Sequence, residues 1–340
     1  MSARPRTAGS VRFIVVFVGA VALAMVAIVL SLGVGARPVA PSVVLDALVN
    51  YDPSNNDHVV VVTQRIPRTL IGLLAGLALA LAGTVMQGLT RNPFADPGLL
   101  GVNAGASTAV LVAITVFGVT RPQGFVWFAF AGAAIASLVV AAIGSRGPDG
   151  ANPAKLALTG AAVTAGLTAV TLLILTTQSA ALDVYRFWSV GSLTGRELDT
   201  VAVVLLPLLI GVLLALTTAR GLNLIALGED TATGLGHSVA RTRGIGIAAT
   251  VLLAGGATAL AGPIVFLGLV VPHAIRAVIG GSYGRLMAVG IPFGAALLLI
   301  ADVIGRVIAP PGEVQAGVVI AFVGAPVLIA LVLRGKRVAM

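Results

Sequence analysis

Long apolar stretches, separated by short polar segments, run through the whole chain. A helix needs about 20 apolar residues to cross the hydrocarbon core of a bilayer at 1.5 Å per residue. The pattern predicts ten such helices, at residues 13–34, 66–86, 98–118, 124–144, 156–176, 200–219, 244–262, 263–279, 286–305 and 314–333. We therefore expect an all-α integral membrane protein.

Two of these stretches allow a second interpretation. The first resembles a signal peptide, but its apolar run from Phe13 to Val34 is longer than a secretory core and no clear cleavage site follows it, so we interpret it as an anchor. No charged residue lies between Arg243 and Arg276. We expect Gly262-Pro263 to divide this stretch into two spans; one long kinked helix would instead give nine spans in total.

The overall composition supports a membrane location. Of the 340 residues, 58% are hydrophobic and 10% are charged, and the mean hydropathy is +1.07. A soluble domain of this length could not bury so much apolar surface. The 42 glycines predict helices that approach one another closely through small residues. The chain has no cysteine, which excludes disulfides, thiolate metal sites and cysteine catalysis.

Basic residues predict the orientation of the chain. With the N-terminus inside, 14 of the 21 basic residues fall in cytoplasmic segments, which favours both termini inside and predicts that residues 35–63 and 177–199 are external. They occur singly between apolar runs, so we predict the lipid bilayer as a partner and no nucleic acid. We expect a cytoplasmic tail at 1–12, one transmembrane domain at 13–334 and a second cytoplasmic tail at 335–340.

The polar residues contain no pattern typical of an enzyme or a metal site. Nearly all acidic residues lie in predicted loops. Asp302 is the exception, and it lies one turn from Arg306, where we expect a local ion pair. The three histidines have no ligand-like spacing, so we predict no metal and no cofactor on this chain. No catalytic motif is present, so we do not expect an enzyme.

The two lysines exclude a P-loop. That motif needs Gly-Lys followed by Ser or Thr, but Lys155 follows Ala154 and Lys336 precedes Arg337. If ATP drives transport, ATP and Mg²⁺ must therefore bind to a separate ATPase subunit. The longest predicted cytoplasmic loop, residues 221–243, is the candidate surface to receive it. A carrier driven by an ion gradient is the alternative from another class, and it should carry ionisable residues at mid-membrane depth.

Several sequence blocks, in order, resemble one known family. They are RIPRTLIGLLAGLALALAGTVMQGLTRNPFADPGLLGVNAGAS (65–107), FWSVGSL (187–193), ALGEDTATGLG (226–236), GPIVFLGLVVPHAIR (262–276) and ADVIGRVIAPPGEVQAGVVIAFVGAPVLIALV (301–332). Together they resemble the permease subunits of ATP-binding cassette (ABC) importers for iron-siderophore chelates and vitamin B12. The resemblance implies a type II importer bundle in the cytoplasmic (inner) membrane of a bacterium.

The resemblance also implies partners and a docking surface. It implies a second permease subunit, as a homodimer or heterodimer, two ATPase subunits, and an extracytoplasmic substrate-binding protein. The family's Arg-x-x-Arg before span two and its arginine after span nine, which meet acidic residues of the binding protein, correspond here to Arg65, Arg68 and Arg306. We expect them at a wet rim, where they would act mainly on orientation and association rate.

A cytoplasmic gate is implied at the turn between spans two and three. Asn92 matches the family, whereas Phe94 stands where leucine is more usual. The opposing wall corresponds to the start of span five, where Pro153 and Ala154 replace the small hydroxyl residues of some relatives.

Residues that contact the ATPase are implied in the loop 221–243. They are Leu227, Gly228, Glu229, Ala232, Leu235 and Gly236. The predicted substrate is a ferric siderophore, with vitamin B12 or haem as alternatives within the same family.

Overall fold

A computed structural model describes residues 6–35, 38–119, 121–144, 146, 153–195, 198–310 and 312–338, and over these residues all regular structure is helical. The elements are α1 (Arg6–Gly33), α2 (Pro41–Val49), α3 (Asn56–Val60), the π-helix η1 (Val61–Arg65), α4 (Ile66–Thr90), the 3-10 helix η2 (Pro97–Leu100), α5 (Val102–Thr115), α6 (Pro122–Gly144), α7 (Pro153–Thr177), α8 (Ser179–Ser189), α9 (Leu198–Ile225), α10 (Glu229–Gly234), α11 (Val239–Ala261), α12 (Leu267–Ile279), α13 (Tyr283–Ile308) and α14 (Ala316–Val338).

The predicted all-α membrane fold is confirmed. Within the described ranges, seven helices are long and apolar enough to cross a membrane, and three shorter apolar helices correspond to the remaining predicted spans. Gly262, with φ of 75°, ends α11, and α12 begins at Leu267, so residues 244–279 form two helices rather than one. Ten crossings and the inward orientation of the termini stay predictions.

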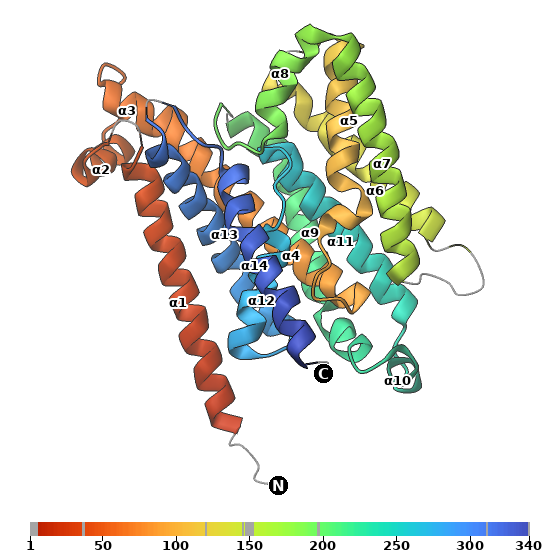
Figure 1. Cartoon of the computed structure of the whole chain (residues 1–340). Coiled ribbons are helices and arrows are strands. Elements are labelled where there is room, and N and C mark those ends of the chain that lie inside the picture. Colours follow the sequence, from red (N-terminus) through yellow and green to blue (C-terminus); the bar gives the residue numbers. More distant parts are fainter. Residues whose placement is uncertain are drawn as a thin grey trace.

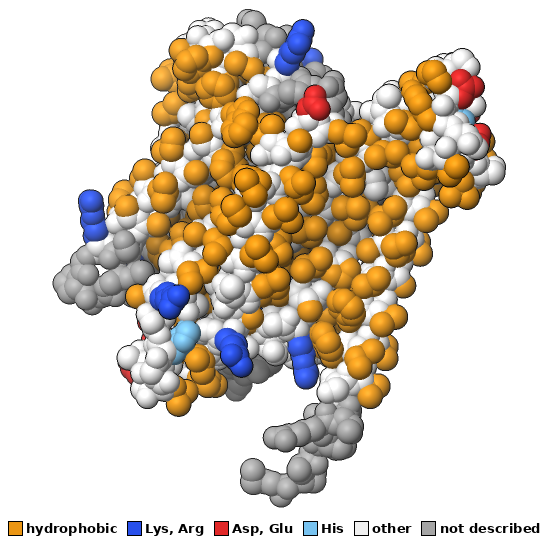
Figure 2. Space-filling model, turned by 180° about the vertical axis from the view of Figure 1, so that it is seen from behind, with side chains coloured by type: hydrophobic (Ala, Val, Ile, Leu, Met, Phe, Trp, Pro, Cys, Tyr) orange, Lys and Arg blue, Asp and Glu red, His pale blue; other side chains and the backbone are white. Residues whose placement is uncertain are grey.

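Figure 1 shows how the elements divide between the two ends of the bundle. The start of α1, the short helix α10 and the end of α14 lie at one end, and α2, α3 and α8 lie at the other. Figure 2 shows a broad band of apolar side chains between the two ends, with the charged side chains of this face gathered toward them. We refer to the ends as the α10 end and the α2 end.

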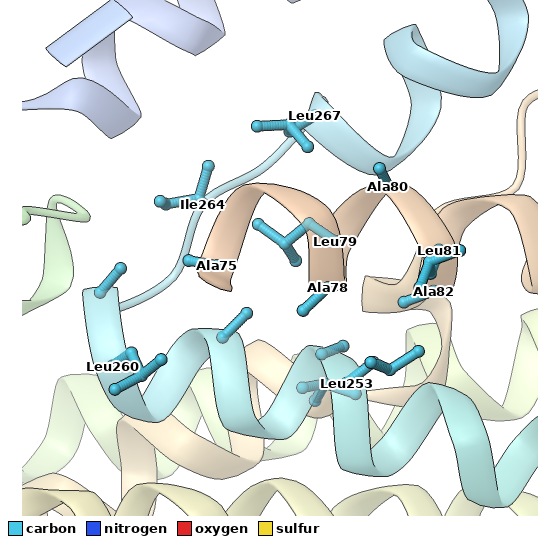
Figure 3. Close-up of a cluster of buried hydrophobic side chains, with 14 of the residues drawn as sticks. Ala75, Ala78, Leu79, Ala80, Leu81, Ala82, Leu253, Leu260, Ile264 and Leu267 are labelled. Atoms are coloured by element: carbon cyan, nitrogen blue, oxygen red, sulfur yellow. The ribbon is translucent and has the colours of Figure 1, made fainter. Parts of the chain in front are cut away.

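Helix α4 lies at the centre of the bundle. It packs against α9, α11, α12 and α13, and most of its side chains from Ile71 to Leu89 are buried. In Figure 3 Ala78 points toward the α11 helix that carries Leu253 and Leu260, and Ala80 lies on the opposite side of α4, toward Leu267. Because alanine occupies many of these positions, the neighbouring helices pack close to α4.

Paired glycines set the closest contacts of α4 with its neighbouring helices. A Cβ added to Gly83 would lie 1.9 Å from the carbonyl oxygen of Gly268, where α4 crosses α12. A Cβ added to Gly76 would lie 2.5 Å from the carbonyl oxygen of Gly294 in α13. These contacts are between backbones, which cannot move aside as a flexible side chain can.

Three regions differ from the predicted boundaries. Residues 56–63, at the end of the predicted external segment 35–63, and the two residues after them continue the helix that contains α4. A π turn joins the two parts through the bond from Ile66 N–H to Val61 O. Pro67 has no backbone N–H, so one hydrogen bond to the preceding turn is missing. Helices deviate from regular geometry at prolines and at π turns, and both occur here. The predicted external loop 177–199 contains α8, and α9 extends to Ile225, which shortens the predicted coupling loop 221–243.

Gly83→Ala is expected to lower the free energy of unfolding by about 1–3 kcal/mol, because the added methyl group forces α4 and α12 apart. The measurement is unfolding of purified protein in mixed detergent micelles. Gly19→Ala in α1 is the matched control, since no atom lies within 4 Å of a Cβ there. Equal stability of the two variants would contradict the close α4–α12 contact.

Candidate functional site

A buried carboxylate joins two arginines at the α2 end. Asp302 of α13 is fully buried. The guanidinium of Arg68, from the first turn of α4, donates through Nε to both carboxylate oxygens, at 3.1 and 2.9 Å, and through Nη2 to Oδ1 at 2.8 Å. Arg306, one turn along α13, donates to Oδ2 through Nε at 3.0 Å and also through Nη2. The predicted pair between Asp302 and Arg306 is confirmed.

Arg306 also binds the C-terminal end of α1. Its Nη1 donates to the carbonyl oxygens of Ser31 at 2.7 Å and Val34 at 3.1 Å, and its Nη2 donates to the Ser31 hydroxyl at 3.1 Å. Together with the bonds to Asp302, these contacts use all five N–H donors of the guanidinium. Carbonyls at a helix C-terminus lack intrahelical donors and carry partial negative charge, so a cation there stabilises the helix end.

Two further residues complete this network. Arg65, at the end of η1, donates through Nη1 to the carbonyl oxygen of Leu32 at 2.5 Å. Glu313, in the connection between α13 and α14, accepts from Arg68 Nη1 at 2.8 Å. The bond from Val314 N–H to Gly305 O at 2.9 Å folds this connection back onto α13 and so positions Glu313. We call Arg65, Arg68, Asp302, Arg306 and Glu313 the outer charge network.

The outer charge network contains the three arginines predicted for docking, but they are not exposed to solvent as expected. Arg306 is 2% exposed and Arg65 is 6% exposed, so the expectation that they lie in water is wrong for both. The side chains of Arg68 and Glu313 are 11% and 31% exposed, and they form the part of the network nearest to solvent. A role of the arginines in docking stays a prediction.

The predicted gate residues of the first turn lie at the α10 end. Arg91, with φ of 52°, ends α4 in the left-handed region, and the side chain of Asn92 then accepts from Phe94 N–H at 2.9 Å. Asn92 and Phe94 are both exposed. Asp96 accepts from Gly98 N–H at 2.8 Å, and burial raises the pKa of its carboxyl group.

The opposing gate wall lies at the start of α7. Pro153 begins this helix, but its side chain lies outside the described residues, and Ala154 is exposed. Two turns further on, α7 touches the segment that follows the gate turn: a Cβ at Gly160 would lie 1.7 Å from the carbonyl oxygen of Leu99. This contact brings α7 against η2. A gating role of these four residues is not tested by this arrangement.

The predicted ATPase-contact residues surround α10. Leu227 and Leu235 lie on either side of the helix and are largely exposed, whereas Ala232 is buried. Gly228 and Gly236 have φ of 114° and 78°, which a residue with a side chain rarely adopts. Glu229 pairs with Arg243 Nη2 at 2.5 Å. Figure 1 shows α10 at the α10 end, so the two exposed leucines that flank this helix lie at that end.

A polar network missed by the sequence analysis lies behind the gate turn. The side chain of Gln87, which is buried, donates to Leu269 O at 3.3 Å and accepts from Arg276 Nη1 at 3.1 Å. The guanidinium of Arg276 lies over the ring of Tyr283, whose N–H donates to Asn223 at 3.0 Å. The backbone carbonyl of Gln87 accepts from Asn92 N–H at 3.2 Å, which ties the network to the gate turn.

Only one signal in the sequence pointed to this network. Arg276 stands at the end of the resembling block 262–276, whereas Gln87 is a single polar residue in a long apolar run. Across the described ranges, no group of three or more His, Asp or Glu side chains lies close enough to hold a metal ion.

Comparison with known proteins decides the family. The profile of the FecCD transport family matches residues 23–334. The chain belongs to the FecCD transport family. It is 49% identical over 319 residues to the ferric enterobactin transport system permease protein FepD of Escherichia coli K12, covering 94% of this chain and 95% of that protein. It is 34% identical to the iron(3+)-hydroxamate import system permease protein FhuB of Bacillus subtilis 168, covering 98% of this chain and 85% of that one.

A solved structure extends the comparison to the fold. The FecCD chain superposes with a TM-score of 0.80 on an inward-facing "metal-chelate type ABC transporter", at 25% identity and covering 94% of this chain and 99% of that one. FecCD proteins are ABC importer permeases, transport subunits rather than enzymes. The FecCD chain is therefore a multi-pass protein of a bacterial inner membrane.

Asp302→Asn in the FecCD chain is expected to lower the free energy of unfolding by about 3–5 kcal/mol, because it leaves two guanidinium groups without their buried partner. Glu313→Gln removes a charge from the same network where it is partly exposed, and should cost about 1 kcal/mol or less. The measurement is unfolding in mixed micelles at one pH. Similar losses for both variants would contradict the central place of Asp302.

Proposed function

We propose that this chain is the permease subunit of an ABC importer and forms the pathway by which a ferric siderophore crosses the cytoplasmic membrane. The observation that carries this function is the 49% identity, over nearly the full length of both chains, with a ferric enterobactin permease. Further relatives named for ferric hydroxamate and ferric citrate import point to the same class of substrate. The second permease subunit would complete the pathway.

The alternatives receive less support. The relatives named above are permeases for iron chelates, and their names do not favour vitamin B12 or haem as the substrate. An ion-driven carrier needs ionisable groups at mid-depth. Within the described long helices, each acidic residue lies within two turns of a helix end, and Asp302 is already paired with two arginines.

Uptake into vesicles tests the function. Proteoliposomes that contain the permease dimer and its ATPase should take up radiolabelled ferric enterobactin only when the binding protein is outside and ATP is inside. A variant ATPase that binds but does not hydrolyse ATP is the control. Uptake driven by a proton gradient without ATP hydrolysis would contradict the importer, and uptake of cobalamin but no ferric chelate would contradict the substrate.

The outer charge network is proposed to receive the binding protein through Arg68. Its guanidinium is held by Asp302, and its Nη1 donates to Glu313, which is the more exposed of the two carboxylates. A carboxylate of the binding protein could take the place of Glu313 with little rearrangement, because the bond to Asp302 keeps Arg68 in position. Bonds of this kind contribute about 1.5–3 kcal/mol when well desolvated.

Glu313→Gln is expected to tighten docking about fivefold or less, since it removes a competitor worth about 1 kcal/mol or less. Arg68→Gln should weaken docking, and the difference between the two variants should shrink in high salt. The measurement is the dissociation constant of the siderophore-binding protein on nanodiscs that contain the permease. Weaker docking by Glu313→Gln, or unchanged docking by Arg68→Gln at low salt, would contradict this role.

The α10 end is proposed to receive the ATPase. Leu227 and Leu235 are exposed at an end where α10 is held in place by the Glu229–Arg243 pair, and an apolar surface of this kind suits a cleft in a partner. Movement of α10 would reach the gate turn through α9, Asn223 and the network around Gln87. Asn92, Phe94, Pro153 and Ala154 are proposed to form the gate that this movement opens.

Leu235→Asp is expected to abolish copurification of the ATPase and to reduce uptake to background, because it places a charge in an apolar contact. Leu227→Asp should behave in the same way. Asp230→Asn, an exposed change in α10 between the two leucines, is the control and should retain both ATPase copurification and uptake. Full uptake by the two leucine variants would contradict an ATPase contact at α10.

A further inference from the structure

Helix α2 has apolar side chains on two of its faces. One face carries Val44 and Ala47, which are buried in a small core with Val39 and Val61. The face turned away from this core carries Leu45, Leu48 and Val49, which are 64%, 51% and 79% exposed. Residues three and four apart lie together on a helix surface, so these three side chains form one patch. We call it the α2 patch.

The depth of the α2 patch follows from α1. The apolar run from Phe13 to Gly33 rises about 31 Å, close to the thickness of the hydrocarbon core. Gly33 therefore lies near the outer boundary of that core. Val39 N–H donates to Gly33 O at 3.0 Å, so Val39 lies at the same depth as Gly33, and α2 begins two residues later. The helix α2 thus starts at the boundary between hydrocarbon and headgroups.

The α2 patch continues the apolar surface of α1. Val26, Val29 and Leu30 are exposed along the outer part of α1, and only 11% of its most apolar window is buried against the protein. Figure 1 shows α2 beside the end of α1 at the edge of the bundle. At the right edge of Figure 2, apolar surface runs along the same part of the molecule toward its outer tip, where acidic side chains follow.

The position of α2 is fixed by a histidine. His58 of α3 is buried; its Nδ1 accepts from Asp52 N–H at 3.1 Å, and its Nε2 lies 3.3 Å from the Asp46 carboxylate of α2. Tyr51, just after α2, is exposed, and tyrosine is enriched where hydrocarbon meets headgroups. From Pro38 to Gln64 the sequence has three aspartates and no lysine or arginine, so this region does not attract anionic headgroups.

We propose that α2 is an interfacial helix, and that the α2 patch inserts into the outer leaflet of the bilayer. Burial of these three apolar side chains, rather than attraction to anionic lipid, would hold the helix there. Because α3 leads through η1 directly to Arg65, this contact would also fix the outer end of α4 relative to the membrane. The inference rests on the membrane location of the chain and on the predicted orientation with the N-terminus inside, and it needs neither a substrate nor a partner protein.

Site-directed spin labelling tests the proposal, and the absence of cysteine makes the native chain a ready background. A nitroxide would be attached to Leu48→Cys, Leu45→Cys or Val49→Cys, one at a time, in nanodiscs of phosphatidylcholine alone. Oxygen, which concentrates in hydrocarbon, and a water-soluble nickel chelate would serve as relaxing agents. Val29→Cys in α1 is the lipid control, and Ser54→Cys in the turn after α2 is the water control.

The expected result is an oxygen-to-nickel accessibility ratio at the α2 patch that is several-fold higher than at Ser54 and approaches the ratio at Val29. The ratio should not change when anionic lipid replaces part of the phosphatidylcholine. A ratio at the α2 patch equal to that at Ser54 would overturn the proposal. The proposal would also be overturned if the α2 patch became protected from the nickel chelate only after the siderophore-binding protein was added, because that protein rather than lipid would then cover the patch. Neither outcome would affect the proposed import function, because the measurement involves no transport.

Discussion

The burial of one carboxylate constrains the whole α2 end of the structure. An ionised Asp302 inside a membrane protein would be strongly unfavourable without cationic partners. Arg68 and Arg306 supply them, and Arg306 in turn holds the last carbonyls of α1. Asp302 thereby joins α4 to α13, and Arg306 joins α13 to α1. The network stabilises the outer ends of these three helices together.

The remainder of the bundle depends on close packing rather than on charge. Small residues let α4 contact α12 and α13 backbone to backbone, for example at Gly83 and Gly76. Rigid packing of this kind suits the proposed transmission of movement from α10 to the gate turn. The polar network around Gln87 and Arg276 adds directed side-chain bonds that link α9, α12 and the end of α4 near the gate turn.

The spanning helices and one ion pair could be predicted from the sequence, because both depend on local patterns. Apolar length predicts the spanning helices, and the four-residue spacing of Asp302 and Arg306 predicts their pair. The bond between Arg68 and Asp302 joins residues 234 positions apart, and no local pattern indicates such a contact. The burial of Arg65 and Arg306 was missed for the same reason, since it depends on where α1 ends. Helix α8 was missed because it lies in a segment read as external loop.

The most direct test of the central claim is amide hydrogen exchange at the end of α1. In the native chain, Arg306 and Arg65 hold the carbonyls of Ser31, Leu32 and Val34, and local opening there should be rare. In Asp302→Asn, we predict faster exchange from Leu30 to Val34, together with the outer turn of α13, and unchanged exchange at α10. Exchange at the end of α1 that is the same in both proteins would contradict the account.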